Sequence, residues 1–283
     1  MHTFLDLNPS LDNARFVIVP VPYEKTTSYG KGASKGPHAI IDASHYLESF
    51  DLETKKEVLN IYTLKRSKAS RFQGSKGNKN LIEKVKSLIA KKKIPVILGG
   101  EHSITGVAIR AFRSYVPELS VLQIDAHGDL RDALQNDKWS HGSVMRRVLE
   151  ICPATQVGIR DMSKEGYQFA KKSKQINNIF FAKDIVSTQG FGFRNLLRRI
   201  ISTLKKNVYI TIDVDGFDPS VFPATGTPEP GGLSWNQGLD ILKEVCRQRN
   251  VIGFDLMELS PQKNSIVSDY AAAKLVYKII SFI

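Results

Sequence analysis

The sequence predicts an α/β protein whose parallel sheet is covered by helices on both faces. Short β-branched runs alternate along the chain with longer segments of helical periodicity, the order that builds parallel strands joined by helical crossovers. Runs such as Val96-Ile97-Leu98 are apolar throughout, which is typical of strands buried on both faces. No repeat, long linker or break in composition divides the chain, so we expect one domain over residues 1–283.

The expected elements follow in chain order. The strand candidates share a short apolar or β-branched run: 16–20, 95–98, 121–124, 156–159, 178–181, 208–212 and 251–255. The helical stretches between them share a longer amphipathic pattern: 81–92, 144–149, 193–204 and 237–247. Pro37 marks the start of a further helix, and another helix is expected at the C-terminus.

Composition excludes several classes of protein. With 42% hydrophobic and 24% charged residues, the chain is not expected to be disordered. No apolar run reaches the roughly 18 residues needed to span a bilayer, so no membrane partner is expected. The two cysteines, Cys152 and Cys246, are far apart and outside any CxxC, which excludes a disulfide framework and a thiolate zinc site. No secretory signal is apparent at the N-terminus, so we expect a cytoplasmic protein.

The net charge of +12 raises the question of nucleic-acid binding. The excess is diffuse, which is typical of a lysine-rich solvated surface, so no nucleic-acid partner is expected. The densest basic segment, 64–80, also carries serine, glycine and asparagine and is interpreted as an exposed loop whose role is open. Phe72 alone interrupts it, which is too little for a base-stacking surface.

Ionisable residues follow four of the strand candidates. The segments directly after these strands are Gly99-Gly100-Glu101-His102, Asp125-Ala126-His127-Gly128-Asp129, Asp213-Val214-Asp215 and Asp255-Leu256-Met257-Glu258. Because the carboxyl ends of parallel strands meet at one edge of the sheet, we expect these side chains to converge on one site.

The chemistry of this set favours a metal site. Residues two apart in an extended segment point to the same side, which groups Asp125, His127 and Asp129. Asp213 and Asp215 bring the number of carboxylates to four, and these would repel one another unless cations neutralise them. Carboxylates and imidazoles without thiolate fit manganese best, with iron, nickel, cobalt or zinc as alternatives. With His102 the set is too large for one tetrahedral zinc and fits two ions roughly 3.5–4 Å apart.

These motifs resemble those of the ureohydrolases, the family of arginase and agmatinase. The residues that carry the resemblance are 98–103, 125–129 and 211–219, together with Pro223 and Gly231 and the segment 32–37. The resemblance implies a three-layer α/β/α sandwich with a central, mostly parallel eight-stranded sheet, as in arginases and deacetylases. It also implies two Mn²⁺ per chain and a homo-oligomer, a trimer or a hexamer.

Carried over residue by residue, the resemblance implies a ligand set and two catalytic residues. One ion would take His102, Asp125, Asp129 and Asp213, and the other would take Asp125, His127, Asp213 and Asp215. A bridging hydroxide would attack the guanidinium carbon. Glu258 would bind the guanidinium, and His141 would contact the substrate and shuttle a proton to the leaving amine.

The substrate expected from the resemblance is agmatine, cleaved to putrescine and urea. Arginases carry a second aspartate shortly after the Gly-x-Arg-Asp segment, where this chain has Ser163, and they lack the counterpart of Glu229. The stretch between Asp132 and His141 is also shorter than the arginase loop. Arginine, guanidinobutyrate and formiminoglutamate remain alternative substrates. Each carries a carboxylate and would need a basic residue at the pocket mouth, and the sequence offers Arg131, Arg146 and Arg160 for this. A non-catalytic basic binding protein is the alternative from another class.

Overall fold

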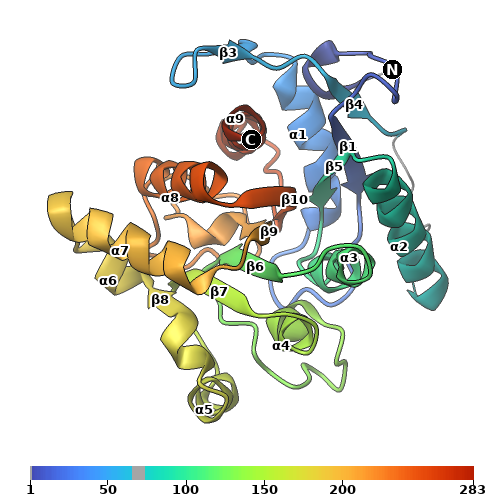
Figure 1. Cartoon of the computed structure of the whole chain (residues 1–283). Coiled ribbons are helices and arrows are strands. Elements are labelled where there is room, and N and C mark those ends of the chain that lie inside the picture. The colour runs from blue at the N-terminus through green and yellow to red at the C-terminus, as the bar shows by residue number, and fades with distance from the viewer. Residues whose placement is uncertain (1, 66–73) are drawn as a thin grey trace.

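The computed structural model describes residues 2–65 and 74–283 and is built around one parallel sheet (Figure 1). The sheet has eight strands in the order β4-β1-β5-β10-β9-β6-β7-β8, and every pair is parallel. The strands are β1 (Phe16–Val21), β4 (Ile61–Thr63), β5 (Ile94–Gly99), β6 (Leu119–Ile124), β7 (Ala154–Ile159), β8 (Ile179–Phe181), β9 (Asn207–Asp213) and β10 (Asn250–Met257). A separate antiparallel hairpin consists of β2 (Phe50–Asp51) and β3 (Lys56–Glu57).

Helices cover both faces of the sheet, as the sequence predicts (Figure 1). One face packs against α1 (Gly36–Ser44), α7 (Gly190–Thr203), α8 (Trp235–Gln248) and α9 (Val267–Phe282). The other packs against α2 (Gly74–Ala90), α3 (Ile104–Arg113), α4 (Val144–Leu149) and α5 (Lys164–Lys172), and the short α6 (Ala182–Val186) follows β8. Alternate strand residues enter the two cores: Phe16 and Ile18 pack on the first face, and Val17 and Val19 on the second.

The expected three-layer sandwich with eight strands is confirmed, and the seven strand candidates all form strands. The sequence interpretation missed β4, a three-residue edge strand whose Ile-Tyr-Thr run is less apolar than the Ile-Phe-Phe of β8, the predicted strand at the other edge. It also missed α3, a ten-residue helix of which eight residues are buried. None of the helices in the described segments is long and apolar enough to cross a bilayer.

The loop expected over 64–80 is wrong in its last part. Residues 66–73 lie outside the described residues, but the chain is helical from Gly74, seven residues ahead of the expected start at Leu81. Glycine and asparagine, which favour turns, are carried here into the first turns of a helix whose later residues Leu81, Val85 and Leu88 are anchored in the core.

The sheet order determines where a site can form. Strands β5, β10, β9 and β6 are consecutive neighbours at the centre of the sheet, and they are the strands followed by the ionisable motifs. The register pairs Ile124 with Ile212 and Met257 with Asp213, so the chain leaves these strands at a common level. Their carboxyl ends therefore bring four distant segments together at one edge.

Candidate metal centre

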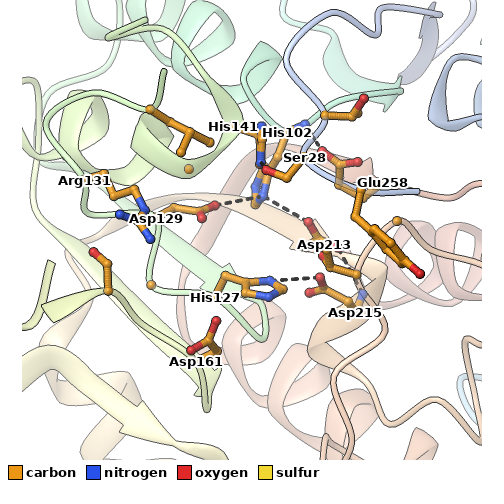
Figure 2. A pocket seen from close by; sticks show the side chains of 18 of the residues that line it. Ser28, His102, His127, Asp129, Arg131, His141, Asp161, Asp213, Asp215 and Glu258 are labelled. Atoms are coloured by element: carbon orange, nitrogen blue, oxygen red, sulfur yellow. Dashed lines mark hydrogen bonds and ion pairs between the residues drawn. The ribbon is translucent and has the colours of Figure 1, made fainter. Parts of the chain in front are cut away.

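The predicted ligand residues converge at the carboxyl edge of the four central strands (Figure 2). His102 follows β5 and precedes α3, Asp125 follows β6, and Asp213 is the last residue of β9. Asp129 continues the β6 segment with a φ of 49°, in the left-handed region where a non-glycine residue is strained. Such strain is typical of functional sites, where the surrounding structure holds it in place.

His102 presents one ring nitrogen to three carboxylates. Its Nδ1 lies 3.1 Å from Asp125 Oδ2, 3.3 Å from Asp213 Oδ2 and 3.6 Å from Asp129 Oδ2. Although the ring is 1% exposed, none of these oxygens meets Nδ1 with hydrogen-bond geometry. A nitrogen that carries at most one proton cannot satisfy three anions, so the group is arranged around a shared cation position rather than around a hydrogen bond.

The other ring nitrogen of His102 is anchored from behind. Its Nε2 lies 2.8 Å from Thr211 Oγ1, and that hydroxyl donates to Asp255 Oδ1 at 2.6 Å. Since the threonine proton is engaged by the carboxylate, the hydroxyl accepts the Nε2 proton of the ring. Nδ1 is then the nitrogen that faces the carboxylates, and it can bind a metal ion once its own proton is displaced.

A second cluster lies beside the first. His127 Nδ1 is 3.0 Å from Asp215 Oδ2 and 3.7 Å from Asp125 Oδ1. The possible ligand atoms of His102, Asp125 and Asp129 lie within 4.8 Å of one another, and so do those of Asp125, His127 and Asp215. Asp125 belongs to both clusters. Asp213, the other predicted bridge, belongs to neither by this criterion, but it lies against His102.

The pKa values of the clustered residues are strongly shifted. Burial lowers the pKa of His127, but hydrogen bonds to Asp125 and Asp215 outweigh it and raise that pKa to about 12. Burial also lowers the pKa of His102, but the adjacent Asp125 and Asp213 carboxylates outweigh it, so that pKa lies well above the usual range. Burial and the neighbouring carboxylates also raise the pKa of Asp213. The negative charge of the site thus favours the protonated forms of both histidines and of Asp213, and divalent ions bound among these residues would offset the same charge.

The two predicted catalytic residues flank the clusters. Glu258 follows β10 with a φ of 62°, and its Oε1 accepts a hydrogen bond from the backbone N–H of His102 at 2.7 Å. Burial raises the pKa of Glu258 to about 8. His141 lies in the turn before α4, and its Nε2 is 2.9 Å from Ser28 Oγ. Burial lowers its pKa, so the neutral ring is favoured.

All eight predicted site residues except Asp125 line one cavity of about 260 Å³, and Asp125 lies buried beneath it. Other lining residues were not identified from the sequence as site residues; they include Ser28, Leu134, Asp161 and Met162. No motif signals Ser28, because it reaches the cavity from a loop 113 residues away from His141. Asp161 was part of the Gly-x-Arg-Asp segment, which is the signal that could have identified it.

The three arginines that could bind the carboxylate of an acidic substrate differ in position. Arg131 lines the cavity. The Arg160 guanidinium is instead bound by backbone carbonyls, including those of Asp215 and Glu229, and Arg146 lies over the Phe169 ring. Trp139, near His141 in the chain, is half-exposed beneath Arg110 and does not line the cavity.

Comparisons with known proteins agree with this geometry. The model of the arginase family matches residues 14–281. An N(1)-aminopropylagmatine ureohydrolase of Synechocystis sp. is 38% identical over 282 residues, covering 96% of this chain and 90% of that protein. An agmatinase of Pyrococcus horikoshii is 33% identical and covers 96% of this chain and 94% of its own length. The solved structure of the agmatine ureohydrolase of Thermoplasma volcanium superposes with a TM-score of 0.86 at 28% identity, covering 100% of this chain and 94% of that one.

Proposed function

The chain belongs to the arginase family, and we propose that this ureohydrolase hydrolyses the guanidino group of agmatine to urea and putrescine with two manganese ions. The observation that carries the proposal is one cavity bordered by Glu258, His141 and a cluster of carboxylates and imidazoles whose charges are unbalanced without cations. A basic binding protein would have no use for this arrangement, because its centre attracts cations rather than nucleic acid.

We assign the ligands as the sequence predicts. One ion would be held by His102, Asp125, Asp129 and Asp213, and the other by Asp125, His127, Asp213 and Asp215. In support, Asp125 belongs to both clusters, and Nδ1 of His102 faces the carboxylates of the first. When bound, two such ions lower the pKa of a water enough for its hydroxide form to attack a guanidinium carbon near neutral pH.

Glu258 would hold the guanidinium. Its Oε1 is fixed by the backbone N–H of His102, and the residue lines the cavity, so Oε2 would be available for charge-assisted hydrogen bonds. Burial disfavours the Glu258 anion. A bound guanidinium would therefore stabilise this anion more than it would stabilise an exposed glutamate. His141 would deliver the proton that the leaving amine needs, because a neutral imidazole near the reacting atoms can both take up and release one.

The cavity favours a substrate with an amine tail. The Asp161 carboxylate lines the cavity without a side-chain partner among the described residues, and in Figure 2 it lies on the far side of His127 from Glu258. Ser163, at the arginase aspartate position, accepts the Gly166 N–H as the cap of α5 and offers no charge for an amino-acid group. Among the described residues that line the cavity, Arg131 is the one arginine or lysine, and it is outnumbered by the carboxylates.

A second candidate substrate is N(1)-aminopropylagmatine. The observation in its favour is the 38% identity to the Synechocystis ureohydrolase of that name. This substrate extends agmatine by an aminopropyl group, so it carries one cationic nitrogen more than agmatine does. The Asp161 carboxylate is suited to either tail, because both present ammonium groups.

We further propose that the protein is one domain over residues 1–283, forms a homo-oligomer and works in the cytoplasm. The single sheet with its two helical layers, which runs through nearly the whole described chain, supports the first of these.

A urea-release screen tests the function. The manganese-loaded protein is assayed with agmatine, N(1)-aminopropylagmatine, arginine, guanidinobutyrate and formiminoglutamate. We expect both amine-tailed compounds to have a kcat/KM at least ~10²-fold above that of arginine, because the arginine carboxylate has no dedicated partner. Faster turnover of arginine or another acid would overturn the substrate assignment, and no urea release from any of them would overturn the function.

A further inference from the structure

The loop after β1 reaches across the cavity and contacts both ring nitrogens of His141. Thr26 Oγ1 lies 3.2 Å from His141 Nδ1, and Ser28 Oγ lies 2.9 Å from Nε2. The Thr26 hydroxyl also accepts the backbone N–H of His141 at 3.3 Å. A single threonine therefore meets both the main chain and the ring of the residue that handles the proton, and Figure 2 shows His141 facing Ser28 at the cavity.

The loop is itself anchored on a buried carboxylate. Glu101 is 0% exposed, and its Oε2 accepts the backbone N–H groups of Lys25 and Thr26 at 2.6 and 2.5 Å. Its Oε1 accepts the hydroxyls of Thr26 and Ser103, both at 2.6 Å. Both carboxylate oxygens are thus saturated by donors, so Glu101 is satisfied where it stands and faces no substrate.

These contacts determine which proton lies where. The Thr26 proton can go to Glu101 at 2.6 Å or to His141 at 3.2 Å, and the shorter, charge-assisted bond to the carboxylate takes it. The two lone pairs of Thr26 Oγ1 then accept from the His141 backbone N–H and from Nδ1–H. A neutral ring that is protonated on Nδ1 has its lone pair on Nε2, where Ser28 donates and the cavity begins.

We propose that Thr26, held by Glu101, is a positioning residue that fixes His141 in the Nδ1–H tautomer and aims Nε2 at the reacting atoms. The expected effect on turnover rests on the proposed function, whereas the tautomer of His141 does not. Without the Thr26 hydroxyl the ring can rotate or change tautomer, and a proton on Nε2 would leave His141 unable to accept another from the cavity. The loss should therefore fall on turnover rather than on binding.

The test combines two variants with a spectroscopic measurement. Thr26→Val keeps the shape but removes the hydroxyl, and Thr26→Ser restores it. Thr203→Val, which loses a hydroxyl bonded to the Ile200 carbonyl and to Thr155 Oγ1 away from the cavity lining, is the matched control. We expect Thr26→Val to lower kcat by ~10-fold or more while KM changes little, Thr26→Ser to recover most of it, and Thr203→Val to match the wild type. Wild-type kcat in Thr26→Val, or a Thr26→Ser as impaired as Thr26→Val, would overturn the proposal.

Histidine ¹⁵N chemical shifts provide the arm that does not depend on activity. In the full-length wild-type chain, freed of paramagnetic ions, the His141 ring should be protonated on Nδ1, with its signals assigned by comparison with His141→Ala. In Thr26→Val the population should move toward the Nε2–H form. A wild-type ring protonated on Nε2 would contradict the proposal directly, even if a variant failed to fold. If no guanidino compound were hydrolysed, the proposed function would fail, whereas the tautomer measurement would still decide this inference.

Discussion

At the scale of single residues, the assigned roles separate metal binding from chemistry. His141 contacts Thr26 and Ser28, and no hydrogen bond or ion pair joins its side chain to the predicted ligands in the described chain. His141→Ala should therefore keep its metal and lose turnover by about 10²–10⁴-fold, the usual contribution of a general acid or base. Elemental analysis and steady-state kinetics check this. A kcat within a few-fold of the wild type would make His141 structural.

Glu258→Gln tests the guanidinium contact. The glutamine oxygen can still accept the His102 N–H that Glu258 accepts at 2.7 Å, so the strand end and the metal content should be unchanged. The charge pairing with the guanidinium is lost, which costs about 1.5–3 kcal/mol and lowers kcat/KM by about one to two orders of magnitude. Unchanged kcat/KM for agmatine would show that the guanidinium binds elsewhere.

The sequence predicts some of these residues and not others for a physical reason. Asp125, His127 and Asp129 are close in the chain, so their spacing in an extended segment already groups them. Thr26 and His141 are 115 residues apart, and their contact depends on how a loop crosses the cavity. The left-handed backbone of Glu258 likewise has no local signal, since glutamate rarely adopts it.

At the scale of elements, the site depends on strand ends, and the β2–β3 hairpin depends on the last helix. Lys278 of α9 bonds Asp51 at 2.9 Å and Glu53 at 2.7 Å, with its side chain 10% exposed. Lys278→Met would remove the cationic partner of the buried Asp51 and should cost about 3 kcal/mol in the free energy of unfolding. Lys243→Met, the control, loses a half-exposed pair with Glu53 and should cost less than about 1 kcal/mol.

The same pair gives a pH dependence. Burial raises the pKa of Asp51, but the hydrogen bond and charge of Lys278 outweigh it and hold that pKa below its ordinary value. A lowered carboxyl pKa stabilises the fold above the unfolded value of about 4, and the stabilisation is lost as the pH falls through the folded pKa. Chemical unfolding from pH 7 downward should show the wild type losing its advantage over Lys278→Met below about pH 4. A constant difference down to pH 2 would contradict this.

Strand order shows what sequence patterns can reach at this scale. The buried strands that precede the ionisable motifs were predicted, because their apolar runs stand out in the sequence. The edge strand β4 was not predicted, because its Ile-Tyr-Thr run is less apolar than the equally short Ile-Phe-Phe of β8. The start of α2 at Gly74 shows core anchoring further along a helix overriding local turn preference.

At the scale of the whole molecule, a chain of net charge +12 surrounds an acidic centre. Ions that bind the folded centre and not the unfolded chain stabilise the fold, by about 4 kcal/mol at a thousandfold excess over Kd. We expect chelation to lower the thermal unfolding midpoint and manganese to restore it. In Asp125→Asn, which alters the ligand shared by both clusters, manganese should give little or none of this gain. An unfolding midpoint that is insensitive to chelator would indicate that the centre binds no ion tightly.

The central claim is that two ions in this centre are needed for guanidino hydrolysis. The most direct measurement adds manganese stepwise to metal-free protein and follows urea release from agmatine together with the manganese bound per chain. The account predicts negligible release without metal and a rate that stops rising at two ions per chain. Full activity without metal, or a maximal rate with a single ion bound, would contradict it.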